Sequence, residues 1–212
     1  MKALGMIEVY SFTTAVCAAD IMAKTADVKV IAFDRNRPIR EDVPAPLVMI
    51  VKVEGVVSAV KSAVEAGEAY ARAEGKFIVS HIIANPDDGT EKMAYLLDVN
   101  RDKYNKSLPK TMKDYPEEKI KDVDEAFGLL EISGCVASVE ALDSMTKAAD
   151  VRIIHTEKRL GGRLVTLVVM GQVSAVKAAV EAGAKNAAHL GKIYGTAVIP
   201  RPHREVGKYF EF

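Results

Sequence analysis

The sequence has little of what marks several common functional classes of protein. Its 29 lysines and arginines are balanced by 29 aspartates and glutamates, so the formal net charge at pH 7 is zero. Nucleic-acid binding normally rests on a basic surface field, and no RNA-binding aromatic motif is present, so nucleic acid is not an expected partner. The first residues contain no apolar run of signal or membrane length. We therefore expect a cytoplasmic protein without a membrane segment.

Residues with the spacing of a catalytic or metal site are also missing. The two cysteines, Cys17 and Cys135, form no C-x-x-C pair, and both are expected to be small buried or half-buried residues. The four histidines lack metal-ligand spacing, and no nucleophile elbow occurs. Gly161-Gly162 matches neither common glycine-rich pattern for phosphate binding. The sequence thus predicts no catalytic residue, no metal and no cofactor, and the protein is not expected to be an enzyme.

What the sequence does contain is an internal duplication. VSAVKSAVEAG at residues 57–67 returns 116 residues later as VSAVKAAVEAG at residues 173–183. Further upstream the match continues at a spacing of 123, so the first copy has seven more residues between Ile31 and Val57. A period above one hundred residues is too long for a solenoid repeat, whose units run to about 50 residues, and indicates tandem domains. Glu8 and Glu131 recur inside apolar strands and are interpreted as structural contacts.

Hydrophobic periodicity predicts the order β-α-β-β-α-β in each copy. This is an α/β (α+β) fold with a mainly antiparallel sheet flanked by helices. In the first copy strands are predicted at 3–10, 28–33, 47–53 and 76–84, and helices at 14–26 and 56–73. In the second copy strands are predicted at 127–132, 151–155, 164–170 and 192–199, and helices at 137–149 and 173–190.

The copies define two domains, residues 1–84 and 126–212. Residues 85–125 between them mix charges of both signs with three prolines. That composition predicts a solvated linker, with a short helix at residues 91–99.

Several motifs together resemble one family. The first strands read LGMIEV and FGLLEI, and the next helix ends A-x-D-x-M-x-K-x-A-D-V in both copies. The VSAVKxAVEAG helix is shared, and the second copy closes with VIPRPH at residues 198–203. This combination resembles the bacterial microcompartment (BMC) shell domain over nearly all of the chain outside residues 85–125. Two copies in the family's ordinary strand order resemble the unpermuted tandem-domain shell proteins.

The resemblance implies a structural role. Three two-domain chains are expected to close into a trimeric pseudohexamer, a shell tile with a central pore for small polar metabolites or cofactors. The partners it implies are two further copies of the chain, other microcompartment shell proteins and encapsulated enzymes. The implied location is the shell of a cytoplasmic microcompartment.

The resemblance also places the loops at residues 34–46 and 156–162 at the pore. The first loop lies in the region between Ile31 and Val57 where the first copy has seven more residues, and it lacks glycine. It could gate, plug or charge the pore, and the alternative is a surface flap without a transport role. Neither loop contains cysteine, so no iron–sulfur cluster is expected. The expected pore residues are Arg35, Arg37, Arg40, Lys158, Arg159, Gly161 and Gly162.

Contacts between neighbouring tiles are assigned by the resemblance to Lys24, Lys147 and Arg201. The first copy has Asn85-Pro86-Asp87 where the second has Arg201-Pro202-His203, so the edge motif is lost there. One other class remains open: a soluble trimeric ligand-binding regulator of ferredoxin-like build, in which residues 34–46 would bind an effector. The metabolic pathway, the solute and the face that meets the lumen are not indicated by the sequence.

Overall fold

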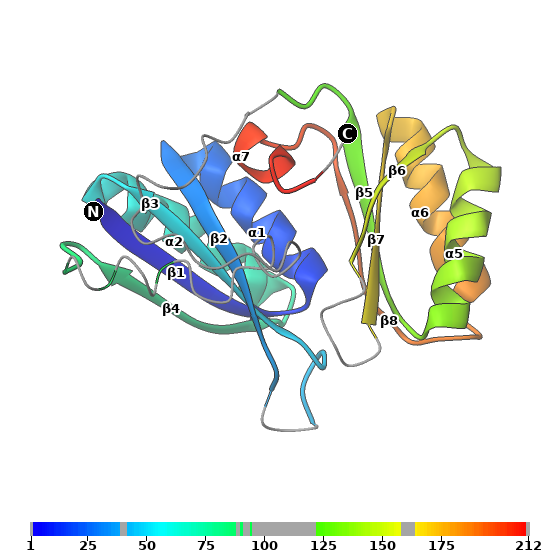
Figure 1. The fold of residues 1–212 in the computed structure, drawn as a ribbon, viewed down its shortest axis with the longest axis horizontal. Helices are drawn as coiled ribbons and strands as arrows, with labels where there is room; N and C mark the ends of the chain where they lie inside the picture. The colour runs from blue at the N-terminus through cyan, green and yellow to red at the C-terminus, as the bar shows by residue number, and fades with distance from the viewer. Residues whose placement is uncertain are drawn as a thin grey trace, which may run out of the picture.

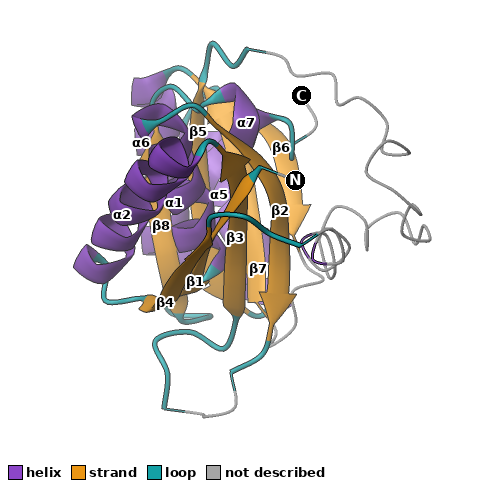
Figure 2. Ribbon diagram, turned by 90° about the vertical axis from the view of Figure 1, so that its left-hand side faces the viewer, coloured by secondary structure: helices purple, strands orange, loops and turns teal. Residues whose placement is uncertain are grey.

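The computed structural model of the protein describes residues 2–38, 42–87, 90, 94, 122–157 and 164–210. The two copies fold as two four-stranded antiparallel sheets, each with two long helices on one face (Figures 1 and 2). No helix among the described residues is long and apolar enough to cross a lipid bilayer. The fold predicted from periodicity is therefore confirmed in both copies.

The first domain has the strand order β2-β3-β1-β4, and each neighbouring pair is antiparallel. Along β1 the side chains alternate between the two faces of the sheet, as the pleat requires. Ile7 is buried toward the helices, whereas Glu8 lies on the opposite face and is half-buried. The elements are β1 (Ala3–Tyr10), α1 (Phe12–Thr25), β2 (Val28–Asn36), β3 (Val48–Gly55), α2 (Val57–Ala73) and β4 (Phe77–Ile83).

The second domain repeats this topology with the strand order β6-β7-β5-β8. Both domains have a register shift at the same place, after Glu8 in β1 and after Glu131 in β5. The elements are β5 (Ala126–Ser133), α5 (Cys135–Ala148), β6 (Arg152–Glu157), β7 (Leu164–Gly171), α6 (Val173–Ala187), β8 (Ile193–Ile199) and the short α7 (Arg204–Gly207).

The glycine that ends the repeated helix motif allows the two helices of each domain to pack closely. A Cβ atom added at Gly67 in α2 would lie 2.8 Å from Cγ of Met22 in α1. The same contact recurs in the second domain, where a Cβ atom at Gly183 would lie 2.5 Å from Cγ of Met145. Since any larger side chain would push the helices apart, glycine is required at this position of the motif for the helices to pack.

The structure corrects the sequence-based boundaries at two places, and it leaves a third prediction untested. Asp34, Arg35 and Asn36 continue β2 and pair with β3, so they are not part of a loop as predicted. The helix α7 was not predicted, because a four-residue helix shows no periodicity. Of the predicted linker helix at residues 91–99 only Ala94 is described, and the rest lies outside the described residues. Ala94 is buried against Leu4 and Ile31.

One apolar cluster extends across both domains. The cluster behind the first sheet continues through α1 into residues of β5 and the C-terminal segment. Phe33 of β2 packs edge-on against Tyr209, with ring centroids 4.7 Å apart, and Phe127 of β5 does the same with Phe210 at 5.4 Å. A second cluster fills the space between the second sheet and its own helices. The C-terminal segment therefore joins the domains by apolar packing.

Candidate functional site

The described pore residues, Arg35 and Arg37, lie at the opposite end of the first domain from the predicted edge residue Lys24. Figure 1 shows the end of β2 and the connection toward β3 at the bottom, and α7 at the top beside the end of α1. Lys24, in the last turn of α1, is therefore far from Arg35 and Arg37. Lys147 occupies the equivalent last turn of α5.

At the predicted pore end, Arg35 is half-buried on β2 opposite Met49 of β3, and Arg37 is exposed just beyond the strand. On the sheet face away from the helices, Lys52 and Asp34 form an ion pair, and both side chains are at least nine-tenths buried. The second domain has Val168 at the position of Lys52, so the pair is confined to the first domain. Arg40, Lys158, Arg159, Gly161 and Gly162 lie outside the described residues.

At the predicted edge, both lysines form the same intrahelical ion pair. Lys24 Nζ lies 2.6 Å from Asp20 Oδ2, and Lys147 Nζ lies 2.6 Å from Asp143 Oδ2. The hydrogen bond from Lys147 to Asp143 raises the pKa of this lysine. Arg201 is exposed in the turn that follows β8. The spacing of Lys and Asp by four residues on one helix face explains the pairing in both domains.

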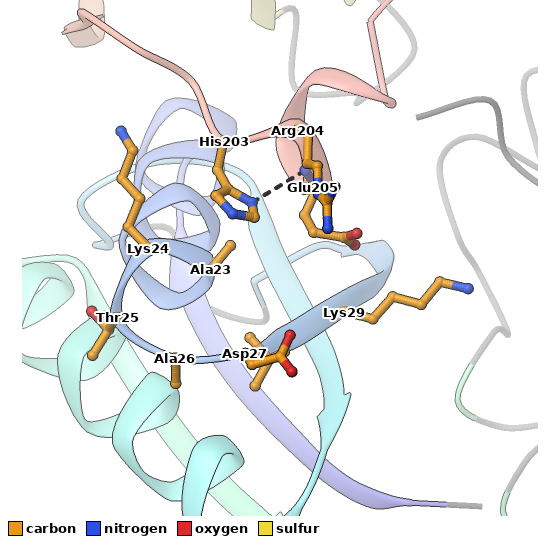
Figure 3. A pocket seen from close by; sticks show the side chains of 10 residues that line it. Ala23, Lys24, Thr25, Ala26, Asp27, Lys29, His203, Arg204 and Glu205 are labelled. Carbon is orange, nitrogen blue, oxygen red and sulfur yellow. Dashed lines mark hydrogen bonds between the residues drawn. The ribbon is translucent and has the colours of Figure 1, made fainter. Parts of the chain in front are cut away.

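A pocket of about 430 Å³ opens between the end of α1 and the start of α7. His203 fixes its wall, because its backbone N–H donates to Asp20 Oδ1 at 2.7 Å and its Nδ1 accepts from the Glu205 N–H at 3.3 Å. In Figure 3 Lys24 and Lys29 extend away from each other on either side of the pocket, with Asp27 between them. The pocket is thus lined by α1 of the first domain and by the C-terminal segment of the second domain.

The polar centre of the domain junction is Glu131. Its carboxylate is fully buried and accepts hydrogen bonds from the Ser11 hydroxyl and from the backbone N–H groups of Phe12 and Thr13, at 3.2 and 3.3 Å for the latter two. These N–H groups belong to the first turn of α1, where backbone N–H groups have no hydrogen-bond acceptor within their own helix. A carboxylate at this position also interacts favourably with the positive end of the helix dipole.

Ser11 shows how closely the junction is fitted. It is the only non-glycine residue with positive φ (81°) among the described residues, and its side chain also accepts from the Thr14 N–H at 3.4 Å. Such a conformation is unfavourable for a residue with a Cβ atom. At the equivalent position the second domain has Gly134, with φ 94°. Serine supplies a hydroxyl for Glu131 that glycine cannot.

The C-terminal segment makes a second set of contacts with the first domain. Glu205 Oε2 accepts from the Val30 N–H at 2.9 Å, and Lys208 Nζ donates to the Val30 carbonyl at 2.6 Å. Tyr209 donates its hydroxyl to the same carbonyl at 3.3 Å. Val30 is buried at the register shift of the outer strand β2, so the C-terminal segment supplies hydrogen-bond partners for backbone groups at this sheet edge.

The second domain carries the same helix face as α1, but nothing covers it within the described residues. Thr13 and Val16 of α1 are 3% and 0% exposed, whereas the equivalent Val136 and Val139 of α5 are 74% and 63% exposed. Glu8, the equivalent of Glu131, makes no hydrogen bond or ion pair with any described residue, and partial burial raises its pKa. Each half of the junction therefore exists a second time, without a partner among the described residues.

The described part of the chain contains both cysteines, and its possible metal ligands are scattered. No cluster of three or more metal-ligating side chains occurs there. Cys17 is buried as expected, and burial raises the pKa of its thiol to about 11. Cys135 is exposed, contrary to expectation, because it stands at the start of the uncovered helix α5. Sequence reasoning identified Glu131 as a structural contact but gave no signal for its partners, which are 118–120 positions away in the chain.

Comparison with known proteins finds relatives of both domains. The model of the family described as the BMC domain matches residues 3–86 and 126–202. "Bacterial microcompartment shell protein PduA" of Citrobacter freundii is 48% identical over 84 residues, which are 40% of this chain and 89% of PduA. "Carboxysome assembly protein CcmO" of Synechococcus elongatus is 34% identical over 200 residues, 94% of this chain and 65% of CcmO. A solved microcompartment protein from Desulfitobacterium hafniense covers 98% of the chain at 24% identity, with a TM-score of 0.38.

Proposed function

The chain belongs to the BMC-domain family, and on that premise we propose that three copies of it close into a ring of six domains around a central pore. Family membership gives the general role: the chain is a structural shell protein of a bacterial microcompartment and not an enzyme. Its place is the microcompartment shell in the cytoplasm, where it assembles with other shell proteins. The soluble regulator considered above has no support among these relatives.

The duplicated junction is the observation that carries the ring. Within one chain, the first turn of α1 donates to Glu131 of the second domain. The next copy of the chain offers Glu8 at the position of Glu131, and α5 offers the backbone N–H groups of Cys135 and Val136 at the position of Phe12 and Thr13. Joining α5 of one copy to β1 of the next repeats the contact and covers Val136 and Val139.

Such an interface is heterologous, because different surfaces of the two domains meet. A heterologous interface forms a closed ring if its rotation divides a full turn, and an open helix if it does not. The resemblance to BMC shell domains implies flat rings of six domains, and a chain of two domains then closes with three copies. Burial of two exposed valines per junction favours the joining of neighbouring copies, at about 1.5–3 kcal/mol for each fully buried side chain.

At the pore we propose that the β2–β3 connection lines the axis and that its arginines favour small anions. Arg35 and Arg37 lie at the end of β2 opposite the proposed tile edge, and Lys52–Asp34 holds this strand end against β3. The other residues assigned to the pore by resemblance are Arg40, Lys158, Arg159, Gly161 and Gly162. The solute would be a small polar metabolite or cofactor of negative charge.

Two experiments test these proposals. Electron microscopy of the purified protein should show discs with a central depression, which open helical filaments would contradict. For the pore, shells that contain an enzyme with an anionic substrate should turn it over more slowly when Arg35, Arg37 and Arg40 are replaced by Ser. Replacing the exposed Lys61 and Lys177 of the outer helices by Ser is the matched control. Equal rates in all three proteins would favour the surface flap without a transport role.

A further inference from the structure

A ring built from this chain has two kinds of outer edge, and this inference rests on the proposed ring. The in-chain edge consists of Lys24, Asp27, Lys29, Arg201 and Arg204, where α1 meets the C-terminal segment of the same chain. The between-chain edge is the equivalent surface at the other junction. It consists of Lys147, Asp150 and Arg152 of one copy with Asn85 and Asp87 of the next.

The in-chain edge is basic. Its four cationic side chains are exposed, and the only exposed carboxylate among its five residues is Asp27. Lys24 is paired with Asp20, but Lys29, Arg201 and Arg204 have no ion-pair partner among the described residues. The acidic Glu205 nearby is buried and already bound by Lys208 at 3.0 Å. The surplus positive charge at this edge is therefore not neutralised within the chain.

The between-chain edge has lost this surplus. Asn85 stands at the position of Arg201 and Asp87 at that of His203. Arg152, the equivalent of Lys29, is paired with Glu125, whereas the first domain has Lys2 at the position of Glu125. Asp150 is exposed and has no cation bound to it in the described part of the chain. The five residues of this edge hold two carboxylates and two cations, and Glu125 beside Arg152 adds a third carboxylate, so the edge has no excess of positive charge.

We propose that in a flat sheet the in-chain edge of each ring pairs with the between-chain edge of a neighbouring ring of the same protein. Contact of two in-chain edges would place eight exposed cations against two carboxylates, which is unfavourable. Contact of unlike edges places Arg201 and Lys29 of one ring opposite the carboxylates of the next. The partner of the basic edge is thus a second copy of the ring.

Ring geometry makes this pairing possible at every edge. In a three-fold ring the two kinds of edge alternate around six sides, so each in-chain edge lies diametrically opposite a between-chain edge. Rings that all have the same orientation then meet through unlike edges on all sides. Pairing of like edges would need neighbouring rings in opposite orientations, and three mutually adjacent rings cannot satisfy that condition.

Charge exchange between the edges tests the proposal. One variant makes the in-chain edge acidic (Lys29→Glu, Arg201→Glu), and a second makes the between-chain edge basic (Asn85→Lys, Asp150→Lys). Each alone should raise the protein concentration needed for sheet formation by about tenfold, because it creates like charges at the contact. Combining both variants should restore sheets, since the charges are then complementary again. Lys61→Glu with Lys177→Glu, on the exposed sides of α2 and α6, is the control for a change of net charge.

The mass of each variant in solution separates this proposal from the ring itself. A wild-type protein that is not a trimer would remove the ring and both edges with it. Trimers of both variants whose combination fails to form sheets would overturn the pairing of unlike edges, as would single variants that form sheets like the wild type. Wild-type trimers that form sheets only with a different shell protein would also contradict it. Sheets of wild-type protein should dissolve as salt is raised, because the paired charges are exposed.

Discussion

Replacing Glu131 by alanine should lower the stability of the single chain, whereas replacing Glu8 should affect assembly instead. The two carboxylates are equivalent by duplication, but only Glu131 has hydrogen-bond partners within the described part of the chain. Glu131→Ala removes the acceptor of the Phe12 and Thr13 N–H groups inside a buried junction. Each orphaned buried N–H group costs roughly 1–3 kcal/mol, and the lost contact with the helix dipole roughly 0.3–1 kcal/mol. The free energy of unfolding of the chain should therefore fall by about 2–7 kcal/mol.

Glu8→Ala should leave the free energy of unfolding of the single chain unchanged within about 0.5 kcal/mol, as is usual for residues without specific contacts. It should instead prevent assembly, because it removes the acceptor for α5 of the next copy. The assay is urea unfolding followed by circular dichroism at a concentration where Glu8→Ala is monomeric, comparing Glu8→Ala with the double variant that also carries Glu131→Ala. The reasoning is refuted if Glu131→Ala leaves the unfolding midpoint unchanged, or if the Glu8→Ala protein assembles like the wild type.

Three further predictions follow from particular contacts. The pKa of Glu8 is raised in the single chain and should fall when its carboxylate accepts N–H donors in the ring, so the trimer should weaken as the pH drops below the raised value. Sedimentation at a series of pH values measures this weakening, and Glu8→Gln should make the trimer less dependent on pH. Iodoacetamide should modify Cys135 rapidly in the monomeric Glu8→Ala chain and slowly in the trimer, while Cys17 stays unmodified in both. Mass spectrometry measures the modification, and equal rates for Cys135 in the two proteins would place α5 outside the interface. Gly5→Ala should lower the free energy of unfolding by about 1–3 kcal/mol, because its Cβ atom would lie 2.6 Å from a methyl group of Val60, and a thermal midpoint equal to the wild type would show that the sheet and helix can separate freely.

The fold could be predicted from the sequence because both of its signals are local. Alternation in β1 and the three- and four-residue spacing in α2 each report one buried face, and the duplication at residues 57–67 and 173–183 gives two independent readings of the same unit. The end of β2 was placed too early, since Asp34 and Arg35 are polar residues that favour a loop reading. Asp34 is tolerated in the strand because Lys52 lies beside it, and that pairing depends on strand register.

The junction could be anticipated only in part. Glu131 was recognisable as a structural residue from its place in an apolar strand, and the tile residues Lys24, Lys147 and Arg201 came from family resemblance alone. The sequence alone does not show that α1 packs against β5, and this packing brings Ser11 to a carboxylate 120 positions away in the chain. For the same reason the exposure of Cys135 was mispredicted, because it depends on which domain covers which helix.

The mass of the wild-type protein in solution tests the central claim most directly. Native mass spectrometry of freshly purified protein at neutral pH should give three times the 23.0 kDa chain mass, with no larger open series. The Glu8→Ala chain measured in the same buffer should give the mass of one chain. A wild-type monomer, a dimer or a ladder of increasing masses would contradict the closed ring and with it the proposed pore.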